Sequence, residues 1–293
     1  MPSRKPVTAR LTRPGVQTGG TTKFRISGGF VPTEDFIPKL VFTSKPWIMP
    51  FGEVPVGNTS IPQYSPPYTT GLNHFKLSAL VVEYYTTAAA AKAVIPDVLE
   101  IDDEPLCRSS VFNYSMSTVG HYKEYVHQIE VKWKGKKYNY CVSLILDNES
   151  AIFSGRETWG FPKVFGTVDV KIQTASAHIM STIERPKGQH VVQVGFTPVS
   201  KHTGPRPEGD RTESLTLRVI PSPVPGSAPD VKQLVSTDFS ITGGDLWIGK
   251  GSVSFPIASE YNPFHKLPVV KYANAFYLDN ADAVLHLKET WKL

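Results

Sequence analysis

Prolines and glycines interrupt this chain along its whole length, and they constrain its fold more than any other feature. The 293 residues include 25 prolines and 22 glycines, which leave little room for helices of ordinary length. Between them lie short runs that alternate between apolar and polar residues, such as Val191-Gln-Val-Gly-Phe and Leu215-Thr-Leu-Arg-Val-Ile. A period of two residues is typical of β-strands that are buried on one face. The sequence therefore predicts a mainly β fold.

The element pattern predicts a single antiparallel β-barrel or sandwich with a few short helices, which could enclose a ligand cavity. A short helix is expected over 86–95, because two threonines can cap an alanine run that Pro96 ends. Gly135 is expected at the tip of a hairpin turn. Strands are predicted over 76–85, 107–116, 124–134, 137–147, 150–154, 166–173, 178–184, 190–197, 213–221, 231–241, 245–255 and about 269–286.

No shift in composition demands a boundary between two folded domains, so residues 23–293 are predicted to form one domain. Residues 1–22 are basic, rich in Thr and Gly and without an apolar period, and we expect a flexible arm. Residues 45–72 combine prolines with aromatic side chains that would be costly to leave in water. They are predicted to form an ordered loop that covers the core.

Composition excludes several classes of function. A net charge of +5, with 19% charged residues, is too weak to argue for nucleic-acid binding. No apolar stretch reaches the length of a membrane span, and the first residues lack the apolar segment of a secretory signal, so a cytoplasmic protein is expected. Cys107 and Cys141 are too few for a disulfide framework, and they are predicted to be buried free thiols. The scattered histidines predict no metal site.

One segment carries a pattern suited to chemistry, residues 146–166. In it, Lys163 lies between Pro162 and Val164, close in sequence to several aromatic residues. Burial among apolar groups disfavours the charged ammonium and lowers the pKa of a lysine, and a neutral amine can attack a ketone to form a Schiff base. The alternative is a lysine whose stem covers apolar surface while its amine reaches water.

Three stretches with similar order and spacing resemble the acetoacetate decarboxylase family. They are Lys92-Ala-Val-Ile-Pro-Asp-Val-Leu-Glu-Ile-Asp-Asp-Glu-Pro-Leu106, then Tyr122-Lys-Glu124, then Leu146-Asp-Asn-Glu-Ser-Ala-Ile-Phe-Ser-Gly-Arg-Glu157 with Gly-Phe-Pro-Lys163 after it. The likeness covers roughly residues 75–290. It implies a β-rich, barrel-like or cone-like enzyme, often a homo-oligomer, that uses neither a metal nor an organic cofactor.

The resemblance also implies catalytic residues. Lys163 matches the lysine that forms the Schiff base, and Glu124 matches a family glutamate that would act as general acid and base. The second lysine of the family's Pro-Lys-Lys motif is Val164 here, so a neighbouring cation is absent from that position. A further family glutamate falls near 109–111 and an arginine near 76–77, where this chain has neither.

These departures keep several functions open. The first is a decarboxylase-like, Schiff-base-forming lyase that acts on a ketone or keto acid. The aromatic segment 45–72 hints at a larger, polyketide-like substrate of secondary metabolism. The second uses the same iminium chemistry as an aldolase-dehydratase or a dehydratase/cyclase. The third is a barrel that binds a small molecule without catalysis. The apolar wall of the substrate pocket is predicted to comprise Phe112, Tyr122, Trp159 and Phe161.

Overall fold

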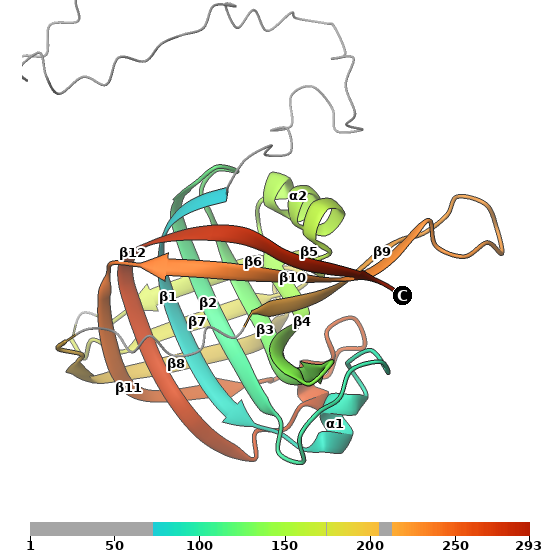
Figure 1. Cartoon of the computed structure of the whole chain (residues 1–293). Helices are drawn as coiled ribbons and strands as arrows, with labels where there is room; N and C mark the ends of the chain where they lie inside the picture. The colour runs from blue at the N-terminus through green and yellow to red at the C-terminus, as the bar shows by residue number, and fades with distance from the viewer. Residues whose placement is uncertain (1–72, 174, 205–212) are drawn as a thin grey trace, which may run out of the picture. The chain divides into compact units, whose positions relative to one another are not determined.

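Strands dominate the computed structural model, which describes residues 73–173, 175–204 and 213–293 (Figure 1). The predicted arm at 1–22 and the predicted covering loop at 45–72 lie outside the described residues. The mainly β fold expected from the sequence is confirmed. The elements are β1 (Asn73–Tyr85), α1 (Ala88–Lys92), β2 (Leu106–Ser117), β3 (Tyr122–Trp133), β4 (Lys136–Leu146), α2 (Glu149–Trp159), β5 (Lys163–Phe165), β6 (Thr167–Ile172), β7 (Ile179–Glu184), β8 (His190–Lys201), β9 (Ser214–Ile220), β10 (Val231–Thr242), β11 (Asp245–Ser254), η2 (Pro263–Lys266) and β12 (Lys271–Lys292).

The strands form one large mixed sheet. Its order is β1-β2-β3-β4-β9-β10-β12-β11-β8-β7-β6, with β5 beside β4 and an additional pairing between β1 and β12. Neighbours are antiparallel except where β4 runs parallel to β5 and to β9. Strand β4 therefore brings its hairpin partner β3 together with β5 and β9, which come later in the chain.

Residues 150–154 were predicted as a strand, and this prediction is wrong, because they lie in helix α2. The Asn148 side chain accepts a hydrogen bond from the Ala151 amide, which caps the helix N-terminus. Gly160 ends the helix in the left-handed conformation, with φ of 72°, that favours glycine. Local capping therefore prevails over the short apolar run that suggested a strand.

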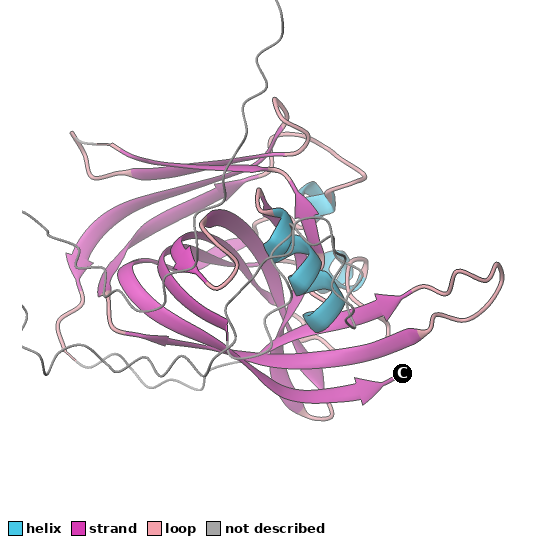
Figure 2. Ribbon diagram, turned by 90° about the horizontal axis from the view of Figure 1, so that it is seen from above, coloured by secondary structure: helices cyan, strands magenta, loops and turns pink. Residues whose placement is uncertain are grey.

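Helix α2 is anchored on β9 (Figure 2). The Thr216 hydroxyl donates to the Trp159 carbonyl at 2.6 Å, and the Arg218 Nε donates to the Glu157 carbonyl at 2.7 Å. These bonds satisfy carbonyls at the helix C-terminus, which have no partner within the helix. They hold the end of α2 in place just before the chain enters β5.

Strand β4 carries an irregularity that later determines which side chains share a face. The expected hairpin between β3 and β4 is present, with Lys134 and Gly135 at positive φ in the turn. Farther along, His127 pairs with Ser143 but Gln128 pairs with Cys141, so Val142 is an extra residue, a β-bulge. The bulge changes the alternation of β4 from that point.

The buried side chains gather on the two sides of β3. Tyr125 and Ile129 belong to the main hydrophobic cluster, whereas Val126 packs in a smaller cluster with Cys141 and Leu144. Both cysteines are buried and free, as predicted. Within the described ranges, no helix has the length and apolar character needed to cross a membrane.

Candidate active site

Lys163 is held at the first position of β5, a strand of three residues. Its amide donates to the Phe161 carbonyl at 2.7 Å, which closes a tight turn centred on Pro162. The fixed φ of proline suits this turn. The Pro162 carbonyl accepts from the Leu144 amide at 3.1 Å, and Arg156 donates from Nη1 to the Lys163 carbonyl at 3.1 Å. Strand β4 and helix α2 thus fix the backbone of Lys163 from two sides.

Gly155 in α2 leaves the space through which the Lys163 side chain passes. A Cβ at residue 155 would lie 2.5 Å from Lys163 Cδ and 2.7 Å from Cε, closer than any real carbon contact. Glycine in a helix interior costs about 1 kcal/mol relative to alanine. The geometry therefore gives a steric reason for glycine here despite its poor helix propensity.

The Lys163 amine meets a carboxylate inside the protein. Its Nζ lies 3.0 Å from Oε1 of Glu124, and the two side chains are only 9% and 4% exposed. The other oxygen, Oε2, accepts a hydrogen bond from the Tyr114 hydroxyl at 3.2 Å. Burying two opposite charges costs the desolvation of both groups, so such a pair contributes little to stability. Pairs of this kind often mark a functional site.

Aromatic rings enclose this pair. The Lys163 Nζ is 5.7 Å from the centre of the Tyr122 ring and 5.6 Å from that of Phe161. Burial, and secondarily the Glu124 charge, raises the pKa values of Tyr114 and Tyr122 well above their ordinary value. Both phenols therefore stay protonated at neutral pH, and Tyr114 can act as a hydrogen-bond donor to Glu124.

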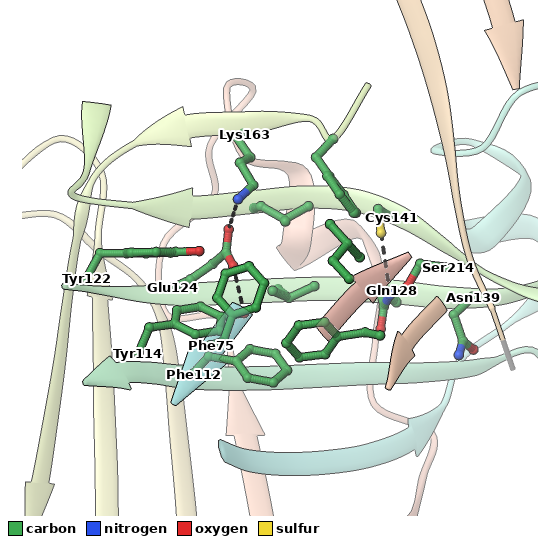
Figure 3. Close-up of a pocket in the computed structure, with 15 residues that line it drawn as sticks. Phe75, Phe112, Tyr114, Tyr122, Glu124, Gln128, Asn139, Cys141, Lys163 and Ser214 are labelled. Atoms are coloured by element: carbon green, nitrogen blue, oxygen red, sulfur yellow. Dashed lines mark hydrogen bonds and ion pairs between the residues drawn. The ribbon is translucent and has the colours of Figure 1, made fainter. Parts of the chain in front are cut away.

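A cavity of about 210 Å³ opens beside the pair (Figure 3). The lysine and the glutamate lie at one end of it, and a separate group of polar side chains lies at the other. Its walls are mainly apolar, which is common for small-molecule sites. The lining residues are Phe75, Phe112, Tyr114, Tyr122, Glu124, Val126, Gln128, Asn139, Cys141, Leu144, Phe161, Lys163, Ser214, Phe239 and Leu285.

The structure brings most of the residues singled out from the sequence to this cavity. Lys163, Glu124, Phe112, Tyr122 and Phe161 all line it. Trp159, in contrast, lines a separate hollow of about 30 Å³ that also contacts Lys163.

Sequence reasoning missed several lining residues. Tyr114 and Gln128 are the most informative of them, and both had a usable signal. Tyr114 follows Phe112 at a spacing of two on β2, and Gln128 follows Glu124 and Val126 at the same spacing on β3. Cys141 and Ser214 had none, since a bulge turns one inward and a pairing distant in sequence supplies the other.

The charges of the cavity wall are few. Among the described lining residues, Lys163 and Glu124 are the only charged side chains. Val164, where the family resemblance implies a second lysine, packs instead against the main hydrophobic cluster. In the described part of the chain, no group of three or more His, Cys, Asp or Glu side chains is arranged to hold a metal ion. The predicted independence of metals and cofactors stays a prediction.

Known proteins are similar to this chain in sequence. A family model for acetoacetate decarboxylase matches residues 49–292. Decarboxylase DEC1 of Cochliobolus heterostrophus is 35% identical over 225 residues, which cover 75% of this chain and 89% of that protein. An acetoacetate decarboxylase of Ralstonia nicotianae is 27% identical over 234 residues, which cover 78% and 92%.

Solved structures agree on the fold. A structure of acetoacetate decarboxylase superposes with a TM-score of 0.69 at 23% identity, covering 78% of this chain and 94% of that chain. The enduracididine biosynthesis enzyme MppR, complexed with pyruvate, superposes with a TM-score of 0.64 at 17% identity, covering 82% and 98%. At these identities the likeness concerns the fold alone.

Proposed function

The chain belongs to the acetoacetate decarboxylase family, and we propose that it is a lyase that forms a Schiff base between Lys163 and a ketone or keto acid. The observation that carries the proposal is the 3.0 Å contact between the buried Lys163 amine and Glu124 at the end of a cavity. A nucleophile next to a group that can take and return its proton is the arrangement that covalent amine catalysis requires.

The first step frees the lone pair of the amine. Transfer of a proton from Lys163 Nζ to Glu124 Oε1 converts a buried ion pair into a neutral amine and a neutral acid. The two atoms are already within hydrogen-bond reach, so no other group is needed to carry the proton. Glu124 then holds the proton that the substrate oxygen will need.

The amine next attacks the substrate carbonyl carbon. The carbonyl oxygen takes up the proton from Glu124, the amine loses one to the resulting carboxylate, and the oxygen leaves as water once it is protonated again. The product is an iminium on Lys163. In a β-keto acid, the electron pair of the bond to the carboxylate flows into the iminium, which releases carbon dioxide and leaves an enamine. The enamine carbon takes up a proton from solvent, and water then hydrolyses the iminium, releasing the ketone and restoring the amine.

The scarcity of charged groups in the described cavity wall also suits a second reaction. Apart from Lys163 itself, no described lining residue offers a cation to a substrate carboxylate. A ketone without a carboxylate could bind here without the cost of desolvating a second anion beside Glu124. Through the same iminium, it would undergo aldol condensation with dehydration, or cyclisation. Decarboxylation remains the first candidate. A keto acid would bring a carboxylate that has no cationic partner other than Lys163 among the described lining residues, and this unfavourable charge disappears when the group leaves as neutral carbon dioxide.

Trapping the iminium tests the proposal directly. The protein is incubated with pyruvate, acetoacetate or a 1,3-diketone, reduced with borohydride and digested for mass spectrometry. We expect a reduced adduct on Lys163, absent from the Lys163→Ala variant and retained in the control Lys171→Ala, whose side chain is exposed. Evolved carbon dioxide would then identify a decarboxylase, and a carbon–carbon condensation product an aldolase.

The opposite result is equally clear. If no ketone yields an adduct, while a ligand still binds the cavity by calorimetry, the protein is a binding module and Lys163 serves as a charge. An adduct distributed over exposed lysines rather than on Lys163 would also contradict the proposed function.

A further inference from the structure

The cavity has a second polar end, remote from the lysine, that the proposed reaction does not use. Gln128 of β3, Cys141 and Asn139 of β4 and Ser214 of β9 line it. Figure 3 shows this group apart from the lysine and glutamate, with phenylalanine rings between the two. Polar side chains that face an otherwise apolar cavity commonly fix the orientation of a ligand.

One departure from regular strand geometry brings this group together. On β3, Glu124, Val126 and Gln128 follow the ordinary alternation and share the cavity face. On β4, the bulge at Val142 turns Cys141 and Asn139 toward the cavity together with Leu144, which regular alternation would prevent.

The neighbouring strand adds a hydroxyl. Asn139 of β4 pairs with Ser214 of β9 in the parallel direction, so the two residues lie side by side. The Gln128 Nε2 donates to the Ser214 Oγ at 3.0 Å and contacts the Cys141 Sγ at 3.4 Å. Gln128 is thereby held in one orientation, and Ser214, which accepts this bond, keeps the capacity of its own hydroxyl to donate.

The chemistry of this end indicates what it would bind. Amide and hydroxyl groups are neutral donors and acceptors, and no charged residue among the described lining set lies with them. Burial raises the pKa of Cys141 to about 12, so its thiol is also uncharged at neutral pH. A neutral oxygen, in a hydroxyl or a carbonyl, fits such a group better than a carboxylate or phosphate does.

The distance to the lysine end sets the length of the ligand. Glu124 and Gln128 are four positions apart on an extended strand, a separation of about 13 Å. Between them, Val126, Phe112 and Phe239 offer only apolar contact. We propose that Gln128 and Ser214 form a distal subsite that hydrogen-bonds a neutral oxygen on an apolar chain whose ketone reacts at Lys163. This inference rests on the proposed function and names its substrate class.

A matched pair of ketones tests the subsite. One is a methyl ketone with a hydroxyl at the far end of a ten-carbon chain, and the other carries a methyl group in place of that hydroxyl. For each protein, half-saturation is measured by borohydride trapping at Lys163 and, independently, by calorimetry without borohydride. We expect the wild type to prefer the hydroxyl ketone about three- to tenfold, the range of one net hydrogen bond.

The variants decide what causes that preference. Gln128→Leu and Ser214→Ala should each bring the ratio between the two ketones close to one, whereas the control Gln193→Leu, a glutamine on β8 that is absent from the cavity wall, should preserve it. Thermal melting of each variant verifies that it is folded, and the serine variant serves if the glutamine variant does not fold.

The outcomes separate this inference from the proposed function. An unchanged ratio in both folded variants, or no preference in the wild type, would overturn the distal subsite. A preference seen by calorimetry and lost in the variants, without any adduct on Lys163, would support the subsite and overturn the Schiff-base proposal.

Discussion

The two faces of strand β3 bury polar groups equally deeply and put them to different uses. On the core face, His127 is fully buried and its Nδ1 lies 2.7 Å from the Tyr125 hydroxyl, which is also 2.9 Å from Ser109 Oγ. Its Nε2 lies 3.3 Å from the Tyr84 hydroxyl. On the cavity face, Glu124 is paired with Lys163 beside open volume.

The difference shows that burial alone does not identify a reactive group. Both ring nitrogens of His127 have protein partners, and aromatic rings of Phe255 and Phe264 pack around it. Such a closed network stabilises one arrangement of the core and has no access to a ligand. The pair on the opposite face borders a cavity, so a substrate can replace one of its contacts.

Replacing the glutamate should have the largest effect on the cavity face. Glu124→Gln removes the carboxylate that we propose to exchange protons with Lys163, while it keeps the size of the side chain. We expect turnover to fall by about 10²-fold or more, the usual contribution of a general acid or base, with adduct formation partly intact. Steady-state kinetics and borohydride trapping measure the two quantities separately. Turnover within twofold of the wild type would remove Glu124 from the mechanism.

Filling the space beside the lysine should come next. Gly155→Ala places a carbon where Lys163 Cδ and Cε now lie, so the amine must shift. A misplacement of about 1 Å can cost about 10²-fold in rate, and we expect a loss of that order in single-turnover adduct formation.

The stability of this variant provides its control. Alanine has the better helix propensity, so a general folding defect is not expected from α2 itself. A matched variant at the neighbouring helix position, Ser154→Ala, should keep the rate. If Gly155→Ala formed the adduct as fast as the wild type, steric placement of the lysine by this glycine would be disproved.

The sequence predicted the lysine end of the cavity better than it predicted the far end. Lys163 and Glu124 were identified from short motifs, whereas Gln128 was missed, although the alternation along β3 puts it on the same face as Glu124. Cys141 could not be predicted, because regular alternation from Leu144 would have turned it away and only the bulge at Val142 brings it inward. Bulges depend on the pairing partner, which a single sequence does not reveal.

The fold was predicted with similar limits. Strand alternation located most strands to within a few residues, but the apolar run at 150–154 was ambiguous between strand and helix. The Asn148 cap and the Gly160 stop resolve it, and both are visible in the sequence. The pairing of β4 with β9, which delivers Ser214 to the cavity, is a contact between distant segments and left no local pattern.

The same substitution on each face of the sheet sharpens the contrast between core and cavity. Tyr114→Phe removes the donor to Glu124 Oε2, and we expect turnover to fall about tenfold, because hydrogen bonds to charged groups contribute about 1.5–3 kcal/mol. Tyr125→Phe leaves His127 and Ser109 without that partner, and should lower the free energy of unfolding by about 1–3 kcal/mol with turnover within twofold.

Kinetics and urea unfolding of both variants check this pair. A reversed pattern, with Tyr125→Phe impairing turnover in fully folded protein, would mean that the core network communicates with the cavity. Equal losses of stability without any kinetic change would remove Tyr114 from the support of Glu124.

The smallest expected effect is the pH dependence that the core histidine gives to stability. Burial lowers the pKa of His127 from 6.5 to about 3, so the folded protein keeps it neutral where the unfolded chain takes up a proton. The groups that face its two ring nitrogens, Tyr84 and Tyr125, stay protonated because burial raises their pKa values. As pH falls from 6.5 toward 3, the histidine therefore lowers the free energy of unfolding by up to about 1.4 kcal/mol per pH unit; above pH 6.5 it contributes no pH dependence.

Carboxylates titrate in the same range, so the histidine contribution must be isolated by difference. Urea unfolding of the wild type and of His127→Gln at pH 7.5, 6 and 5 gives the free energies of unfolding at each pH. We expect the variant to be less stable at pH 7.5, because it disturbs the Tyr125 and Tyr84 contacts, and to lose stability less steeply on acidification. If the free energies of unfolding of both proteins changed with pH to the same extent, His127 would not change its protonation on unfolding. Its burial on the core face of β3 would then carry no electrostatic cost.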